Sequence, residues 1–272
     1  MDVERVEQWL ASGLLLHPLH GCNSVDLSRG VLLLAGVSSD TVCERWGQER
    51  LAQAQELAKE IGGGTHLALI ILDGLGVNSL EKHLARESFL RSRKVRDVRS
   101  VFPATTSAAI TALTTGDFPA QHGLLGWTTT CEGRIINPLP YVEEVSGTSL
   151  SDLGLDAGQV FEGIESSFDL VTSASRRSFS RYTGSPFTAA TQAMEQRHCE
   201  TMADTMEALG DFWQDCHSAG KSSFSYVYLP EPDHTEHGVG FDHEEVGNVL
   251  RDIDAELVRL WESTSSVPGK KV

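Results

Sequence analysis

The order of hydrophobic and polar positions along the 272-residue chain predicts strands that alternate with helices. Two apolar runs, at residues 66–72 and 223–229, have the length and continuous hydrophobicity of strands buried on both faces of a parallel sheet. A weaker run at residues 168–172 predicts a third strand. This alternation favours an α/β fold with a mainly parallel sheet flanked by helices.

Helical periodicity marks segments on either side of these runs. Helices are predicted over residues 3–15, 49–61, 106–115, 199–217 and 244–262. The glycine-rich residues after the second helix, GGGT, are interpreted as a turn, because no Gly-Lys-Ser or Gly-Lys-Thr follows as a phosphate-binding loop requires.

The same pattern suggests how the chain is divided. We expect an N-terminal helical extension over residues 1–64 and a core over residues 65–272. Between residues 126 and 184 the sequence is irregular and rich in Ser, Gly and Pro, so an insertion that forms a cap is expected at about residues 127–190.

Composition narrows the classes of function. The net charge of −16 argues against general nucleic-acid binding, which needs a basic face, and the basic residues 91–99 are interpreted as solvated surface.

No apolar run approaches the ~20 residues of a membrane span, and the acidic N-terminus lacks the basic start of a signal peptide. A soluble, cytoplasmic protein is therefore expected. The five scattered cysteines lack CxxC spacing, which argues against a disulfide framework or a zinc–thiolate site.

An acidic residue follows the first apolar strand. Asp73 lies in the sequence LIILDGLG, at a strand end where a parallel sheet places its ligand sites. A carboxylate at such a buried position is costly unless it binds a metal ion, a cation or backbone donors. The alternative is an Asp that caps the next helix.

A second strand end carries a carboxylate and an imidazole. Asp233 and His237 are four residues apart, so one helical turn would place both on the same side. This combination is a usual zinc pair. The neighbouring His234 and His243 show that histidine is common locally, and these two are interpreted as solvated residues.

Small residues and hydroxyls fill the segment VFPATTSAAITALTTG between these strand ends. Pro103 disfavours helix at the residue before it, so the predicted helix should begin near Thr105 or Thr106. A hydroxyl there lies among free backbone N–H groups at the positive end of the helix dipole, which suits a phosphate. The alternative is an ordinary threonine N-cap.

Together, the three segments resemble the type I phosphodiesterase/nucleotide pyrophosphatase branch of the alkaline phosphatase superfamily. The resemblance runs from about residue 67 to 260 and is carried by LIILDGLG, FPATTSAAITALTTGDFPAQHGLLGW and YLPEPDHTEHGVG, in that order. In that family the nucleophilic threonine lies ten residues before the glycine of a T-G-x-x-P-x-x-H-G run. Here that glycine is Gly116, so the resemblance assigns the nucleophile to Thr106 rather than Thr105, and His122 of the run is interpreted as structural.

The resemblance implies a metal-dependent phosphoric ester hydrolase that acts on a small phosphate ester. Two divalent metal ions, usually zinc, would be bound, one by Asp73 and Thr106 and the other by Asp233 and His237. Thr106 would attack phosphorus in line and form a phospho-enzyme intermediate, which is then hydrolysed.

The sequence also departs from the family pattern. The family completes its metal sites with an Asp-His pair on a later strand and a further histidine, and neither is recognisable here; the pair Asp242-His243 lies too close to His237. The chain ends where the next strand is expected, which predicts a fold without its C-terminal part. The alternative function is therefore a catalytically inactive fragment with a binding role.

A nucleotide substrate and two other classes of protein are less favoured. Trp127 follows Gly126 where many nucleotide-hydrolysing members carry an Asn that contacts phosphate, which argues against a nucleotide substrate. A sulfatase would need a C/S-x-P-x-R motif, which is absent, and the mutases on this fold more usually have a serine nucleophile. A nucleic-acid-binding module is disfavoured by the acidic charge.

Overall fold

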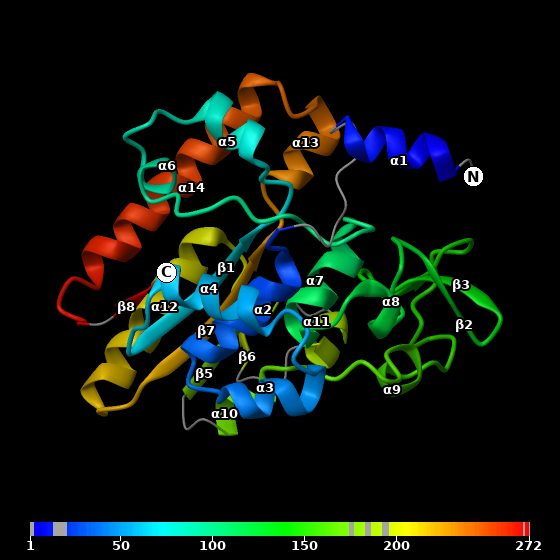
Figure 1. The fold of residues 1–272 in the computed structure, drawn as a ribbon, viewed down its shortest axis with the longest axis horizontal. Helices are drawn as coiled ribbons and strands as arrows, with labels where there is room; N and C mark the ends of the chain where they lie inside the picture. The colour runs from blue at the N-terminus through cyan, green and yellow to red at the C-terminus, as the bar shows by residue number, and fades with distance from the viewer. Residues whose placement is uncertain are drawn as a thin grey trace.

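A five-stranded sheet forms the centre of the fold, and all its pairings are parallel. The structure is a computed structural model that describes residues 3–12, 21–173, 177–182, 186–191, 196–268 and 270–271. The strand order is β6-β5-β7-β1-β8 (Figure 1). The strands are β1 (His66–Leu72), β5 (Arg177–Tyr182), β6 (Gln196–His198), β7 (Ser223–Leu229) and β8 (Lys270–Lys271).

The two apolar runs of the sequence form the two central strands, β1 and β7, with the predicted bounds. They pair over seven positions, from His66 opposite Ser223 to Leu72 opposite Leu229. Because the pairing is parallel and has no offset, both strands end at the same level. The segments that follow them therefore start side by side.

Helices cover both faces of this sheet (Figure 1). Side chains of α12 and α14 share one core with β1 and β7, and side chains of α2, α3 and α10 share another with the same strands. The α/β class predicted from the sequence is confirmed. The larger helices are α1 (Val3–Ala11), α2 (Ser24–Leu34), α3 (Ser39–Trp46), α4 (Leu51–Ile61), α5 (Val77–His83), α7 (Thr106–Thr115), α12 (Met202–Ser218), α13 (Asp233–Val239) and α14 (Glu244–Ser263).

Side chains alternate between the two cores along β1, as they must in a strand. Leu67 and Leu69 belong to the core beneath α2, whereas Ala68 and Ile70 contact the core beneath α14. Burial on both faces explains why the run is apolar throughout rather than alternating.

Residues 129–161 form a small unit of their own beside the sheet. It contains a three-stranded antiparallel sheet and a short helix around a separate core that includes Ile136, Leu150 and Phe161. This core also contacts Ile110 of α7, which fixes the unit next to the sheet (Figure 1). Its elements are β2 (Thr129–Cys131), β3 (Arg134–Asn137), β4 (Val142–Glu143) and α9 (Ala157–Val160).

The strand predicted at residues 168–172 is wrong, because a short helix, α10 (Asp169–Ser173), lies there. The ring of Phe168 lies 5.2 Å from that of Phe224 and 5.3 Å from that of Tyr226, so the apolar residues of this segment pack on one face of the sheet. The place beside β7 is taken by β5, whose more polar sequence gave no strand signal. β5 thus belongs to the main sheet although its residues fall within the range expected for the insertion.

Four further helices are short. They are α6 (Phe89–Ser92), which follows α5, α8 (Pro119–His122), which follows α7, α10, and α11 (Pro186–Thr191). The predicted helix at residues 3–15 is described only to Ser12, where α1 has ended, and residues 13–15 lie outside the described part.

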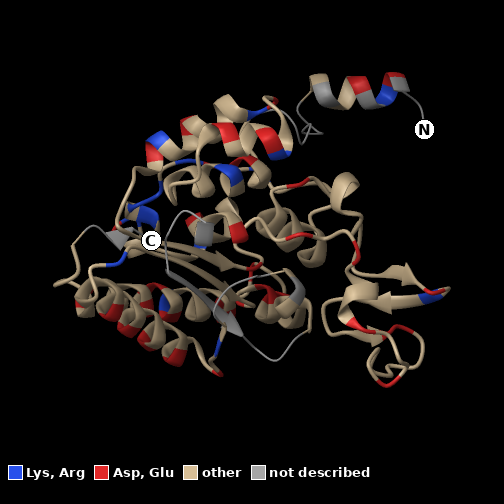
Figure 2. Cartoon of the chain, turned by 90° about the horizontal axis from the view of Figure 1, so that it is seen from below, with Lys and Arg blue, Asp and Glu red and all other residues tan. Residues whose placement is uncertain are grey.

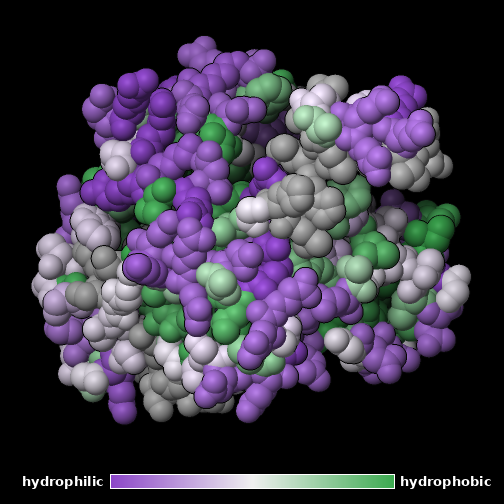
Figure 3. All heavy atoms as spheres, viewed as in Figure 1, coloured by the Kyte–Doolittle hydropathy of each residue, from purple (hydrophilic) through white to green (hydrophobic). Residues whose placement is uncertain are grey.

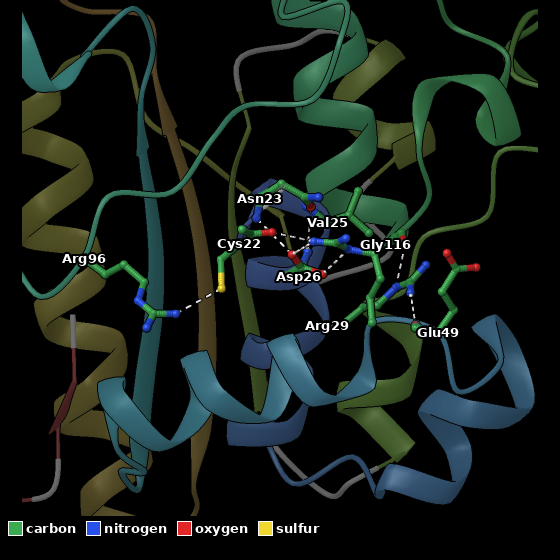
Figure 4. Close-up of polar contacts among 10 residues, drawn as sticks. Cys22, Asn23, Val25, Asp26, Arg29, Glu49, Arg96 and Gly116 are labelled. Carbon is green, nitrogen blue, oxygen red and sulfur yellow. Dashed lines mark hydrogen bonds and ion pairs between the residues drawn. The ribbon is translucent and has the colours of Figure 1, made fainter. Parts of the chain in front are cut away.

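Helix α2, which was not predicted from the sequence, lies against α4 and holds a buried ion pair. Gly30 interrupts its helical pattern, but a Cβ there would lie 2.9 Å from the carbonyl oxygen of Ala54, so the close helix contact requires glycine. Arg50 donates to both carboxylate oxygens of Asp26, at 2.7 and 2.5 Å. Asp26, fully buried, also accepts from the backbone N–H of Asn23, whose side chain caps α2 (Figure 4).

The outer surface is acidic and mostly polar. Asp and Glu are spread over helices around the chain, while Lys and Arg are fewer and scattered (Figure 2). The face seen in Figure 1 is largely hydrophilic with several apolar patches between (Figure 3). Among the described helices, none has the length and hydrophobicity needed to cross a membrane.

We predict that Arg50→Met lowers the free energy of unfolding by about 3 kcal/mol, because it leaves the carboxylate of Asp26 buried without its cation. Chemical denaturation monitored by circular dichroism measures this loss. Arg96→Met is the matched control, because Arg96 pairs with Glu56 and Glu60 at the surface, and its loss should be clearly smaller. Equal losses would contradict a special role for the buried pair.

Candidate active site

The ends of β1 and β7 bring the two predicted strand-end motifs into contact. The backbone N–H of Asp73 donates to the carbonyl of Leu229 at 3.0 Å, and that of Asp233 donates to the carbonyl of Asp73 at 2.9 Å. Gly74 has a φ of +78°, and a Cβ at this position would lie 2.8 Å from the Cα of Asp233. The glycine after Asp73 therefore allows both the turn and the close approach of the second motif.

The carboxylate of Asp73 has three hydrogen-bond donors. Its Oδ2 accepts from the Thr106 hydroxyl at 3.2 Å and from the Tyr228 hydroxyl at 2.6 Å, and its Oδ1 accepts from the N–H of Gly74 at 3.0 Å. Burial raises the pKa of Asp73, and the nearby charge of Asp233 adds to this, while the hydrogen bonds from Tyr228 and Thr106 oppose it. The net direction is upward, so holding this carboxylate ionised costs free energy.

Thr106 is the first residue of α7, as the sequence predicts for a hydroxyl at a helix N-terminus. The N-cap residue, Thr105, makes no side-chain hydrogen bond to the first turn. The N–H groups of that turn and the positive end of the helix dipole therefore lie next to the Thr106 hydroxyl, an arrangement that favours a bound anion.

Most other hydroxyls of the segment bond to backbone carbonyls. Thr111 donates to Ser107 at 2.7 Å, Thr115 donates to Thr111 at 2.8 Å, and Ser107 itself donates to Gly126 at 2.6 Å. Thr106 differs from these three because its hydroxyl donates to a carboxylate. The structure thus separates one hydroxyl that faces an acid from hydroxyls that satisfy the helix and its neighbouring loop.

Asp233 and His237 lie one turn apart on α13. His237 Nε2 is 3.3 Å from Asp233 Oδ2, and the His237 side chain is 80% exposed. The short helix thus presents a carboxylate and an imidazole on one side, as the four-residue spacing predicts.

One open cavity of about 760 Å³ joins these groups. The lining of this cavity includes all four residues that the sequence assigned to the site. Their roles stay predictions. Trp127, which stands where many family members carry an Asn that contacts phosphate, also lines the cavity, and the loop before it is tied to α7 by the bond between Ser107 and Gly126. Tyr228, a further lining residue, was missed. It lies within an apolar strand, and no local sequence pattern marks it as a site residue.

The donors at this cavity fit divalent metal ions in kind but not in number. Asp73 with Thr106, and Asp233 with His237, offer carboxylate, hydroxyl and imidazole ligands, whereas a catalytic zinc ion takes three protein ligands. Across the described ranges, no three His, Cys, Asp or Glu side chains converge on one point. Each pair therefore offers fewer protein ligands than a catalytic zinc ion takes.

The adjacent Asp242-His243 pair does not complete either half. Asp242 is paired with Lys82, and His243 Nδ1 accepts from the N–H of Glu245 at the start of α14. Neither residue lines the cavity.

Comparisons with known proteins identify the family and the fold. The profile of the family described as type I phosphodiesterase / nucleotide pyrophosphatase matches residues 67–266. No curated protein matches the chain. Solved structures with a similar fold include murine ectonucleotide pyrophosphatase / phosphodiesterase 5 and an inactive variant of that protein in complex with AMP.

The similarity to these structures covers only part of them. Identity is 18% and the TM-score is 0.53 in both cases. The alignments cover 75% and 74% of this chain, but 53% and 52% of the murine chains. The chain thus spans about half the length of the solved structures it matches, and this likeness shows the fold alone.

His122, which the motif places near the nucleophile, lies away from the cavity lining. It is buried, and its Nδ1 accepts from the N–H of Leu124 at 3.2 Å. Burial lowers the pKa of His122 to about 4, from an ordinary value of 6.5. A neutral, buried ring is consistent with the structural role predicted for it.

This pKa predicts an acid-sensitive fold. Between about pH 6.5 and pH 4 the unfolded chain binds a proton at His122 that the folded chain does not, so stability falls as the pH drops through this range. The loss reaches about 3 kcal/mol at the acid end. Urea unfolding at a series of pH values should show a shallower dependence for His122→Gln. The exposed His198→Gln is the control, and an unchanged slope in His122→Gln would contradict the prediction.

Proposed function

This chain belongs to the type I phosphodiesterase/nucleotide pyrophosphatase family, and from that premise we propose that it is a phosphoric ester hydrolase with Thr106 as its nucleophile. One observation carries the proposal. The Thr106 hydroxyl lies at the N-terminus of α7 and donates to half-buried Asp73, in a cavity that Asp233 and His237 also line. A hydroxyl, an acceptor for its proton and an anion-binding helix end are the groups that phosphoryl transfer to a side chain needs.

The contacts support a defined first step. The Thr106 hydroxyl donates its proton to Asp73 Oδ2, with 3.2 Å between Oγ1 and Oδ2. This orientation leaves a lone pair of Oγ1 free to attack phosphorus. As the Oγ1–P bond forms, the bond from phosphorus to the leaving oxygen breaks, and Asp73, whose pKa is raised by burial, accepts the threonine proton. The N–H groups of α7 stabilise the charge on the phosphoryl oxygens.

The second step returns the enzyme to its starting state. Water attacks the phosphorus of the phospho-threonine, the P–Oγ1 bond breaks, Oγ1 takes back the proton that Asp73 accepted, and the proton lost by water goes through solvent to the oxygen that left in the first step. Tyr228 keeps the Asp73 carboxylate oriented through both steps with its 2.6 Å hydrogen bond. The products of the cycle are the released alcohol and the phosphate with any ester group that it still carries.

We further propose two divalent metal ions, with zinc the expected metal. Asp73 and Thr106 would bind one, and Asp233 and His237 the other. With its ion bound, Asp73 would stay ionised, and solvent rather than Asp73 would take the Thr106 proton. When bound, such ions supply Lewis acidity and positive charge near the phosphate. The donor types at both pairs support this, while the count of two per pair supports the alternative, a catalytically inactive chain that keeps the fold and a binding role.

The proposed substrate is a small phosphate ester. The open cavity and the absence of a basic track on an acidic chain support a small molecule rather than a nucleic acid. The AMP complex of the murine relative makes nucleotides one class to try, and Trp127 in the cavity favours esters with an apolar group beside the phosphate. A cytoplasmic location stays a prediction from sequence.

Replacement of the nucleophile tests the proposal most directly. We expect Thr106→Ala to reduce hydrolysis of an aryl phosphodiester, with zinc added, by at least about 100-fold, because no hydroxyl remains to attack phosphorus. The neighbour Thr105→Ala is the matched control and should stay within about 3-fold, since the Thr105 side chain makes no capping bond. Wild-type hydrolysis no faster than that of Thr106→Ala would favour the inactive alternative.

Metal content tests the ligand assignment independently of activity. After dialysis against dilute zinc, elemental analysis should give about two zinc ions per chain if both pairs bind. Asp73→Ala and His237→Ala should each remove about one, whereas His198→Ala, outside the cavity, should remove none. Zinc that is absent, or insensitive to these substitutions, would show that the pairs do not bind it.

A further inference from the structure

An indole ring forms part of the wall of the candidate active site. Trp127 lines the same cavity as Thr106, and the residue is 48% exposed. An indole offers a ligand two different contacts, a hydrogen bond from its single N–H or packing against its apolar ring. Which of the two is available decides the chemistry of the ligand group that Trp127 accepts.

The N–H of this indole is used inside the protein. The side-chain oxygen of Asn137, which does not line the cavity, accepts from Trp127 Nε1 at 2.5 Å, and the side-chain nitrogen donates to the Trp127 carbonyl at 3.2 Å. The opposite orientation, with the oxygen toward the N–H of Leu139 at 3.3 Å, would set two donors 2.5 Å apart. Trp127 therefore offers a ligand its ring and no N–H.

Further contacts fix Trp127 beside the nucleophile candidate. Asn137 is buried at the end of β3, a strand that pairs with β2 and with β4. Just before Trp127, the carbonyl of Gly126 accepts from the hydroxyl of Ser107, the residue after Thr106, at 2.6 Å. A ring that is fixed before a ligand arrives binds it without the entropy cost of ordering a side chain.

The rest of the cavity leaves room for more than a phosphate group. Its volume of about 760 Å³ falls in the range of about 300–1,000 Å³ that is typical of sites for small organic ligands. Ala104 and Pro230 add apolar surface to that of Trp127. Among the described residues of this lining, none is Lys or Arg, so a second charged group on the substrate finds no basic partner there.

We propose that Trp127 is a specificity-determining residue that packs against an aromatic ring of the substrate, so that the site takes phosphoric esters that carry such a ring. The inference rests on the proposed function, because it assigns a ligand group to the same site. Aromatic rings pack on an indole by offset stacking or edge to face, and neither arrangement needs the indole N–H. Asn137 is a positioning residue, because it holds the ring and occupies its donor.

Binding of matched esters tests the proposal apart from catalysis. Methyl phenyl phosphate, the methyl ester of AMP and dimethyl phosphate each carry one negative charge on phosphorus, but only the first two carry an aromatic ring. The Thr106→Ala chain, which has no hydroxyl to attack them, is titrated calorimetrically with zinc present. We expect at least one aromatic ester to bind about 10-fold more tightly than dimethyl phosphate, and the tighter one identifies the ring as a phenyl ring or a base. Equal binding of all three esters, or binding of none, would overturn the proposal.

Substitutions of Trp127 in the same chain locate the ring. Trp127→Ala should reduce the preference for the aromatic ester to within about 2-fold, whereas Trp127→Phe keeps an aromatic surface and should retain most of it. Leu125→Ala is the matched control, because Leu125 is 54% exposed two residues away and does not line the cavity. It should leave the preference unchanged. A preference that survives Trp127→Ala would place the ring elsewhere and contradict the assignment.

The indole N–H reports on the role of Asn137. In a proton–nitrogen correlation spectrum, the indole signal that Trp127→Phe removes should lie downfield, as for a hydrogen-bonded N–H, and move upfield in Asn137→Leu. This variant should also reduce the preference for the aromatic ester about 3-fold while dimethyl phosphate binds as before, which a general loss of structure would not do. In the Thr106→Ala chain itself, a signal that moves downfield on addition of dimethyl phosphate would show that the indole donates to the anion, and the proposal would be wrong.

These results are separable from those that test the nucleophile. Ring-dependent binding in a chain whose wild type does not hydrolyse phosphoric esters would refute the proposed function and leave the aromatic site standing. Hydrolysis that depends on Thr106, together with equal binding of the three esters, would support the nucleophile and overturn the aromatic site.

Discussion

The parallel pairing of β1 with β7 is the contact on which the rest of the structure depends. Because Leu72 lies opposite Leu229, both strands end at one level, and the chain places Asp73 and Asp233 in contact there. The same pairing makes both strands buried on two faces, which is why helices must cover each side. A register shift of one residue would turn every side chain of one strand to the opposite core and separate the two motifs.

The candidate active site concentrates groups that do not stabilise the fold. Burial raises the pKa of Asp73, a second carboxylate lies nearby, and Gly74 holds a positive φ so that the strand ends can touch. Such features are typical of functional sites, where a useful arrangement is kept at the expense of stability. The Asp26–Arg50 pair differs, because its cation and carboxylate satisfy each other inside the packing of α2.

The sequence by itself determined the features that depend on local chemistry. Apolar runs identified β1 and β7, periodicity identified α7, α12 and α14, and the ordered motifs identified the family and the residues around the larger cavity. Tertiary structure decided the rest. The polar β5 is a strand because β7 offers it a paired edge, and Phe168 lies just before a short helix with its ring packed on the sheet. Tyr228 joins the site through its hydrogen bond to Asp73, a residue distant in sequence, which no local pattern records.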